Sequence, residues 1–171
     1  MQRTAEGFTL PELLVVLALI GILTHSAMAG FQSLYHREQV TAAINGLRGL
    51  LHRGRAEAMG GPHRTVVCLI GTDCQARAGR QGVLVFYDHN RNRRRDTGER
   101  LIDRLELPEG VTVQWRSFRG KPWLEYRSSG LSWYQSGHFL LCRGDKAWKL
   151  VLNQVGRMYL EEGGSENCPP G

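Results

Sequence analysis

The stretch Gly7–Leu23, with the sequence GFTLPELLVVLALIGIL, decides the fold of this chain. A short polar segment precedes it, and apolar or small residues continue to Phe31 except at Thr24, His25 and Ser26. A stretch of this length is about what an α-helix needs to cross the hydrocarbon core of a bilayer. We therefore expect residues 8–31 to form the membrane-spanning half of a longer helix.

The positions of the polar residues separate two interpretations of this stretch. An ordinary secretory signal is cleaved after its apolar block, next to small residues, and Ala27-Met28-Ala29 is a candidate of that kind. However, Gly7 lies directly before the block, and Glu12 lies inside it, where an ionisable group costs about 2.5–3.5 kcal/mol. Such a carboxylate becomes tolerable when a positive charge pairs with it. A retained helix with a partner for Glu12 is therefore favoured over a discarded signal.

The segment Gly7–Leu14 resembles the class III leader motif of type IV pilins and type II secretion pseudopilins. The resemblance implies that a prepilin peptidase removes a leader of residues 1–7 by cutting between Gly7 and Phe8. It also implies that Phe8 becomes N-methylated and that Glu12 pairs with the N-terminal ammonium of a neighbouring subunit.

The same resemblance implies the partners and the location of the protein. The partners are other minor pilins or pseudopilins, the prepilin peptidase, and the assembly platform of the inner membrane. The chain is expected to cross the inner membrane once, to carry its head in the periplasm, and then to enter a pilus or pseudopilus. No cofactor is implied.

The bulk composition fits one head of ordinary size. The chain has 171 residues, a net charge of +6 and a pI near 9.5, and four arginines between Arg91 and Arg95 supply much of the excess charge. A positive net charge permits contact with nucleic acid or anionic lipid but does not establish such contact. Since no Ser/His/Asp grouping or carboxylate pair suggests catalysis, we do not expect an enzyme.

A second, amphipathic half of the helix is expected over residues 32–60. Apolar or small residues recur there at spacings of three and four, which describes one helical stripe. Its members are Leu34, Val40, Ala43, Ile44, Leu47, Leu50, Leu51 and Ala58. Gly60-Gly61-Pro62 ends the helix.

Strand-like patterns separated by turn signals fill the remainder, residues 61–171. The candidate strands are Thr65–Ile70, Gly82–Tyr87, Arg100–Leu107, Val111–Arg116, Trp123–Arg127, His138–Arg143, Ala147–Leu152 and Arg157–Leu160. Several short strands behind one helix predict an α+β fold, in which the long N-terminal helix packs on an antiparallel β-rich head.

Four cysteines, Cys68, Cys74, Cys142 and Cys168, permit three disulfide pairings. Their spacings do not fit a zinc site, and an exported protein favours bridges over free thiols. Nearness in sequence and the entropy of loop closure favour the pairs Cys68/Cys74 and Cys142/Cys168. A crossed pairing and reduced thiols remain the alternatives.

The segment Asp88–Glu99 matches a calcium-binding EF-hand loop in part. Acidic or amide residues fall at positions one, three, five and nine, and a glutamate at twelve, but position six, which needs glycine, is Arg93. The four arginines would also repel a divalent cation. We therefore expect a polar hairpin connection closed by Asp–Arg contacts, without a metal ion.

The head resembles the FimT/FimU and GspH branch of the pilin family. An aromatic-Asp-x-Asn stretch at Tyr87 is followed by Asp-x-Gly-Glu at Asp96, and the chain ends with a strand cysteine, a Leu-Asn-x-x-Gly-Arg segment (Leu152–Arg157) and a final cysteine. The resemblance implies a β-rich head packed on the C-terminal half of the helix. The cysteine arrangement favours a minor pilin in pilus assembly over a GspH-like secretion pseudopilin, which stays an alternative.

DNA binding at a pilus tip is a further alternative. Some FimT-type pilins bind DNA through a Gly-Arg-x-Arg motif near the C-terminus, of which only Gly156-Arg157 is present here. Arg157 can contact a phosphate, or Gly156 can serve a turn with Arg157 as a solvated strand residue. The other candidate phosphate contacts are Arg91, Arg93, Arg94 and Arg95.

Overall fold

The computed structural model describes residues 9–70, 74, 82–132, 135–163 and 168, without the side chains of residues 24–33, 162 and 163. The chain divides into two compact units, Met1–Gln39 and Val40–Gly171, and one helix, α1 (Leu10–Gly60), has residues in both.

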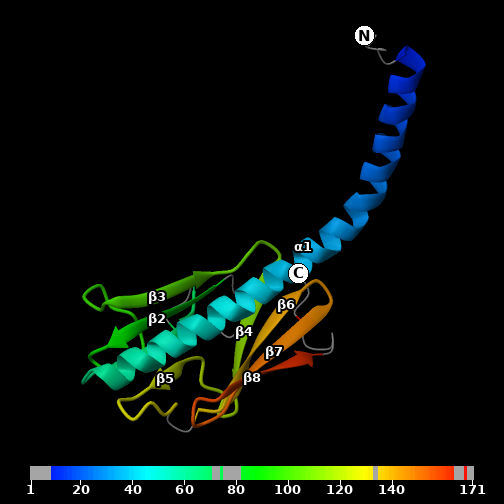
Figure 1. Ribbon diagram of the computed structural model, residues 1–171. Coiled ribbons are helices and arrows are strands. Elements are labelled where there is room, and N and C mark those ends of the chain that lie inside the picture. Colours follow the sequence, from blue (N-terminus) through cyan, green and yellow to red (C-terminus); the bar gives the residue numbers. More distant parts are fainter. Residues whose placement is uncertain (1–8, 71–73, 75–81, 133–134, 164–167, 169–171) are drawn as a thin grey trace, which may run out of the picture. The chain divides into compact units, whose positions relative to one another are not determined.

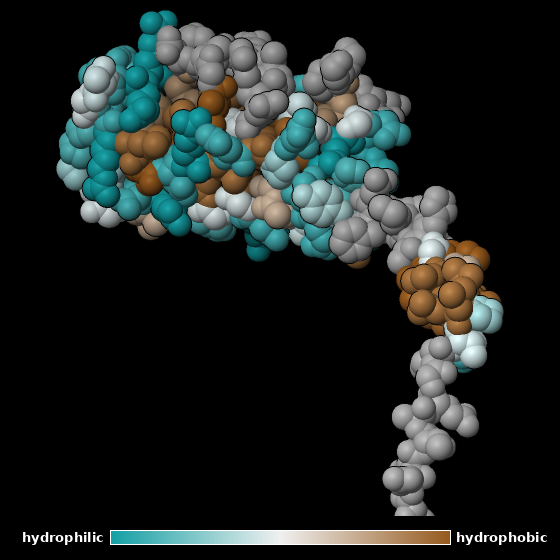
Figure 2. Space-filling view, turned by 90° about the horizontal axis from the view of Figure 1, so that it is seen from above, coloured by the Kyte–Doolittle hydropathy of each residue, from teal (hydrophilic) through white to brown (hydrophobic). Residues whose placement is uncertain are grey.

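The first unit contains the apolar start of α1. Its large apolar side chains between Leu10 and Leu23 are exposed, from 42 % for Val16 to 73 % for Leu10. Figure 2 shows this part, between two grey stretches, as a mostly hydrophobic surface. Within the described parts of the chain, no helical segment combines the length and apolar character that a membrane span requires. The membrane-spanning half over residues 8–31 stays a prediction.

In the second unit, the remaining turns of α1 bury one stripe of side chains. These are Val40, Ala43, Ile44, Leu47, Leu50, Leu51 and Ala58, all less than 5 % exposed. They are the residues that the helical spacing predicts, apart from Leu34, which lies in the first unit and is 55 % exposed. The periodicity therefore identifies the face of α1 that packs on the head.

The head contains two four-stranded antiparallel sheets (Figure 1). One sheet has the order β3-β2-β1-β5, and the other has the order β4-β6-β7-β8. The strands are β1 (Arg64–Leu69), β2 (Gly82–Asp88), β3 (Leu101–Glu106), β4 (Val111–Ser117), β5 (Leu124–Tyr126), β6 (Gly137–Arg143), β7 (Lys146–Leu152) and β8 (Met158–Gly163).

One hydrophobic core joins the buried stripe of α1 to both sheets. It includes Val85 of β2 and Phe139 of β6, whose ring lies 4.5 Å from that of Trp115. Glycine at Gly54 permits a close approach of the helix, because a Cβ atom there would lie 2.8 Å from Cγ2 of Val85. Thr65 fixes this contact by donating its hydroxyl hydrogen to the Gly54 carbonyl oxygen at 2.8 Å.

The predicted α+β class and all eight predicted strands are confirmed. The largest difference at a strand end is at β8, which ends at Gly163 instead of Leu160. Short runs rich in apolar residues and bounded by turn residues mark strands such as β1, β2 and β6, so local sequence patterns were sufficient to predict their positions.

Candidate functional site

The predicted processing residues, Gly7 and Phe8, lie outside the described residues. Glu12 is described, in the first turn of α1, and its side chain is exposed. A carboxylate in the first turn interacts favourably with the helix dipole. Its neighbours Leu13 and Val16 are exposed and apolar, so Glu12 is an isolated charge on an apolar surface.

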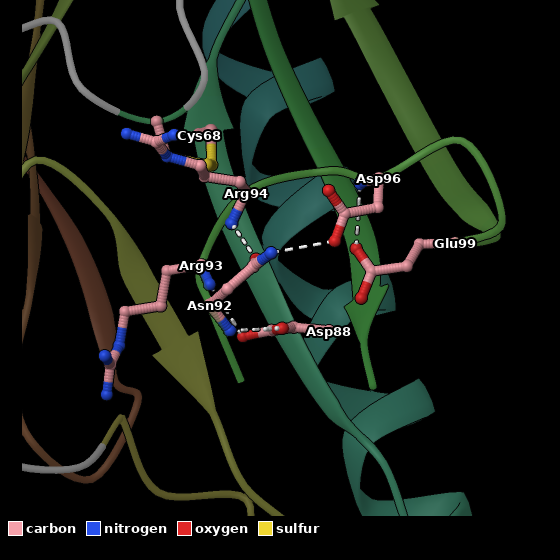
Figure 3. Close-up of a disulfide and its surroundings, with 8 residues drawn as sticks. Cys68, Asp88, Asn92, Arg93, Arg94, Asp96 and Glu99 are labelled. Atoms are coloured by element: carbon pink, nitrogen blue, oxygen red, sulfur yellow. Dashed lines mark hydrogen bonds between the residues drawn. A yellow bond between two sulfur atoms is a disulfide. The ribbon is translucent and has the colours of Figure 1, made fainter. Parts of the chain in front are cut away.

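The β2–β3 loop, residues 88–99, is organised around the carboxylate of Asp88 (Figure 3). Asp88 ends β2 and is 2 % exposed, and its two oxygens accept the backbone N–H groups of Asn92 at 3.1 Å and Arg93 at 3.2 Å. Arg91 and Arg93 adopt positive φ angles of 63° and 62°, which L-residues adopt at a cost. The hydrogen bonds to Asp88 offset that cost.

Two further carboxylates close the same loop. Asp96 accepts the side-chain amide groups of Asn90 at 2.6 Å and Asn92 at 2.7 Å. Glu99 accepts the backbone N–H groups of His89 at 2.8 Å and Asp96 at 3.1 Å. The predicted hairpin connection is present. Asp88 contacts Arg93 through its backbone N–H rather than its guanidinium, and asparagine amide groups donate to Asp96.

Burial raises the pKa of Asp88 above its usual value, while the backbone N–H of Arg93 opposes this shift. The carboxylates of Asp88, Asp96 and Glu99 all accept hydrogen bonds from other groups of this loop. Among the described residues, no group of three or more His, Cys, Asp or Glu side chains is placed to hold a metal ion.

The side chain of Arg93 leaves this loop and reaches β5 instead. Its Nε lies 3.5 Å from Oε2 of Glu125, which is 3 % exposed in the middle of β5. Arg64 of β1 contacts Oε1 of the same carboxylate at 2.7 Å, and Arg127 contacts it at 3.4 Å. One buried carboxylate thus holds three guanidinium groups, an arrangement that the sequence analysis missed.

Two disulfides are present in the head. Cys68 of β1 is bonded to Cys74 across a separation of six residues, and Cys142 of β6 is bonded to Cys168 across a separation of 26. The first pair packs against Phe86 in a small buried cluster. The second joins Cys168 to β6. Both bridges join the cysteines that are nearest in sequence.

The Gly156-Arg157 segment forms the turn between β7 and β8. Gly156 has a φ of 79°, its N–H donates to the Asn153 carbonyl oxygen at 3.0 Å, and its own carbonyl oxygen accepts Nη1 of Arg55 at 3.3 Å. Arg157 is exposed, and its N–H donates to Oδ1 of Asn153 at 2.8 Å. Gly156 therefore has a structural role that links this turn to the end of α1.

Replacing Gly156 by alanine will lower the free energy of unfolding of the head by about 1–3 kcal/mol, because a left-handed backbone at a non-glycine residue is strained. The added Cβ would also collide with the guanidinium of Arg55. Urea denaturation followed by tryptophan fluorescence measures the change. The matched control is Arg157→Gln, which removes an exposed side chain and leaves stability within about 0.5 kcal/mol. Equal stability of both variants would contradict the role of Gly156.

The candidate phosphate-binding residues lie in different parts of the head. Arg91, Arg94 and Arg95 are exposed in the β2–β3 loop, while Arg93 turns toward Glu125. Arg157 lies in a different turn, between β7 and β8.

Comparisons with known proteins agree with this architecture. The family described as type II transport protein GspH matches residues 43–156, more than half of the chain, and the prokaryotic N-terminal methylation motif matches residues 2–28. A search of curated proteins gave no match.

Two crystal structures of the type IV minor pilin FimU from Pseudomonas aeruginosa strain PAO1 are similar to this chain. The crystal in space group P21 gives 15 % identity, coverage of 80 % of this chain and 96 % of FimU, and a TM-score of 0.51. The crystal in space group P65 gives 17 % identity, coverage of 75 % and 96 %, and a TM-score of 0.49. At this identity the likeness is one of fold. The family match over more than half of the chain, together with the methylation motif, shows that the chain belongs to the GspH family of minor pilins and pseudopilins.

Proposed function

We propose that this chain is an assembly subunit of a type IV pilus. It is inserted in the inner membrane with its head in the periplasm, is cut between Gly7 and Phe8, and enters the fibre through α1 together with other minor pilins. The observation that carries this proposal is the single carboxylate of Glu12 on the exposed apolar start of α1, behind a methylation motif.

The chemistry of Glu12 favours assembly over anchoring alone. An anchor gains nothing from a carboxylate that costs about 2.5–3.5 kcal/mol in the middle of a membrane. Cleavage before Phe8 would create an ammonium group on every subunit, at a position four residues before Glu12. Pairing between the ammonium of one subunit and Glu12 of another neutralises two charges that are each costly alone in lipid. The pairing therefore stabilises contact between subunits.

Replacing Glu12 by glutamine will reduce the amount of this subunit in sheared fibres by roughly tenfold or more, because the ammonium of the neighbour loses its counter-charge in lipid. Removal of the leader will continue. Immunoblots of the membrane and fibre fractions measure both effects. Glu38→Gln is the matched control, since Glu38 is an exposed glutamate on the same helix outside the apolar stretch. Wild-type incorporation of the Glu12 variant would overturn the proposal.

A type II secretion pseudopilin is the alternative within the same family. The family description of type II transport protein GspH supports it, while the cysteine arrangement of the head favours the pilus. Deletion of the gene distinguishes the two. Loss of surface pili with normal export of folded proteins supports the pilus subunit, and the reverse result supports the pseudopilin.

DNA binding by Arg157, Arg91, Arg93, Arg94 and Arg95 stays a prediction. A mobility shift with the purified chain at several salt concentrations is the measurement, because phosphate contacts make affinity depend steeply on salt.

A further inference from the structure

A basic pocket lies beside β5. It has a volume of about 290 Å³ and is lined by Arg93, Arg119, Lys121, Trp123, Glu125, Arg127 and Gln135. Trp123, Glu125 and Arg127 occupy alternate positions along β5 and its flanks, so their side chains lie on one face of the strand. Arg93 comes from the β2–β3 loop, and Arg119 and Lys121 come from the β4–β5 turn. Segments distant in sequence therefore converge on one concave surface.

The described lining of the pocket is predominantly basic. Among these lining residues four carry a positive charge, and one, Glu125, carries a negative charge. Glu125 also contacts Arg64, which lies outside the lining, at 2.7 Å. A concave site with excess charge of one sign attracts ligands of the opposite sign.

Contacts with Glu125 and Trp123 position three of the four cations. The guanidinium groups of Arg93 and Arg127 lie 3.5 Å and 3.4 Å from the carboxylate of Glu125. The Arg93 guanidinium lies 5.3 Å from the ring centre of Trp123, and the Lys121 ammonium lies 5.4 Å from it. Cations at these distances from an indole are attracted to it. Trp123 therefore supports the cations of the pocket.

We propose that this pocket binds a dianionic phosphate group. Arginine presents several N–H donors in a fixed fork that matches the oxygens of phosphate, and charge-assisted bonds of this kind are among the strongest hydrogen bonds in proteins. A dianion offsets the excess charge better than a single carboxylate does. The volume equals that of about ten water molecules, which leaves room for a phosphate and a small organic group attached to it. Free inorganic phosphate and a small phosphomonoester share this chemistry.

Titration calorimetry of the full chain in a non-ionic detergent tests the proposal, with inorganic phosphate and glycerol phosphate as probes and chloride as the background anion. We expect saturable binding of at least one probe. Binding of inorganic phosphate supports the free ion as ligand, and binding of glycerol phosphate alone supports a phosphomonoester. In the double variant Arg119→Gln, Lys121→Gln, affinity falls roughly tenfold or more, because charge-assisted hydrogen bonds are lost. Both side chains are exposed, so the fold tolerates their replacement.

The matched control is Lys146→Gln, which removes one positive charge from an exposed position outside the pocket. It should change the affinity less than twofold. Three results overturn the proposal: no saturable binding of either probe, equal weakening by the control and the double variant, or variant-sensitive binding of an oligothymidine in the absence of binding to both phosphate probes. The last result assigns the pocket to nucleic acid.

Discussion

Replacing Gly7 by valine will leave the chain uncut, so that it accumulates in the membrane with residues 1–7 still attached. The methylation motif covers residues 2–28, and the expected cut follows Gly7 directly. A glycine leaves the backbone open to close approach, and a β-branched side chain blocks such an approach. Intact-mass measurement of the purified protein gives the result, since the wild-type chain should begin at a methylated Phe8.

The control for this experiment is Gly21→Ala. Gly21 lies in the same apolar stretch of α1, and a Cβ atom built there meets nothing within 4 Å apart from its chain neighbours and the nearby backbone of its own helix. This variant should be cut like the wild type. A Gly7 variant that begins at Phe8 would remove the assignment of the leader. A wild-type chain that begins after Ala29 would show that the apolar stretch is a discarded signal.

Local patterns in the sequence were sufficient to predict the elements of the fold. The helical stripe from Val40 to Ala58 and the turn residues between strands are short-range features. The pairing of strands into two sheets could not be predicted from the sequence. No local signal in Leu124–Tyr126 assigns β5 to the sheet of β1, and none in Val111–Ser117 assigns β4 to the sheet of β6. That choice depends on contacts between distant segments.

The chemistry of the head was predicted less well than its strands. The loop of residues 88–99 was expected to close through Asp–Arg contacts, yet positive φ angles at Arg91 and Arg93 turn backbone N–H groups toward Asp88. Arg93 is thereby released to contact Glu125, 32 positions away. Nothing in the spacing of these residues indicates that contact. The available signal was Glu125 itself, a charged residue between two apolar residues in a strand of three.

Glu125 organises both the fold and the basic pocket, so its replacement should have a large effect on stability. Replacing Glu125 by glutamine will lower the free energy of unfolding of the head by about 3 kcal/mol. This is the lower end of the cost of breaking a buried ion pair. The lower end applies because the side chains of Arg64 and Arg127 are 23 % and 27 % exposed, and water solvates part of their charge. The glutamine keeps the shape but cannot neutralise three guanidinium groups.

Urea denaturation of the full chain in detergent measures this change. All four tryptophans lie beyond residue 114, so their fluorescence follows the head alone. Glu106→Gln is the matched control, because Glu106 pairs with one arginine, Arg104, at 2.6 Å and is 70 % exposed. An exposed pair contributes about 0–1 kcal/mol. A Glu125 variant as stable as the Glu106 variant would show that the three arginines hold their positions without the buried carboxylate.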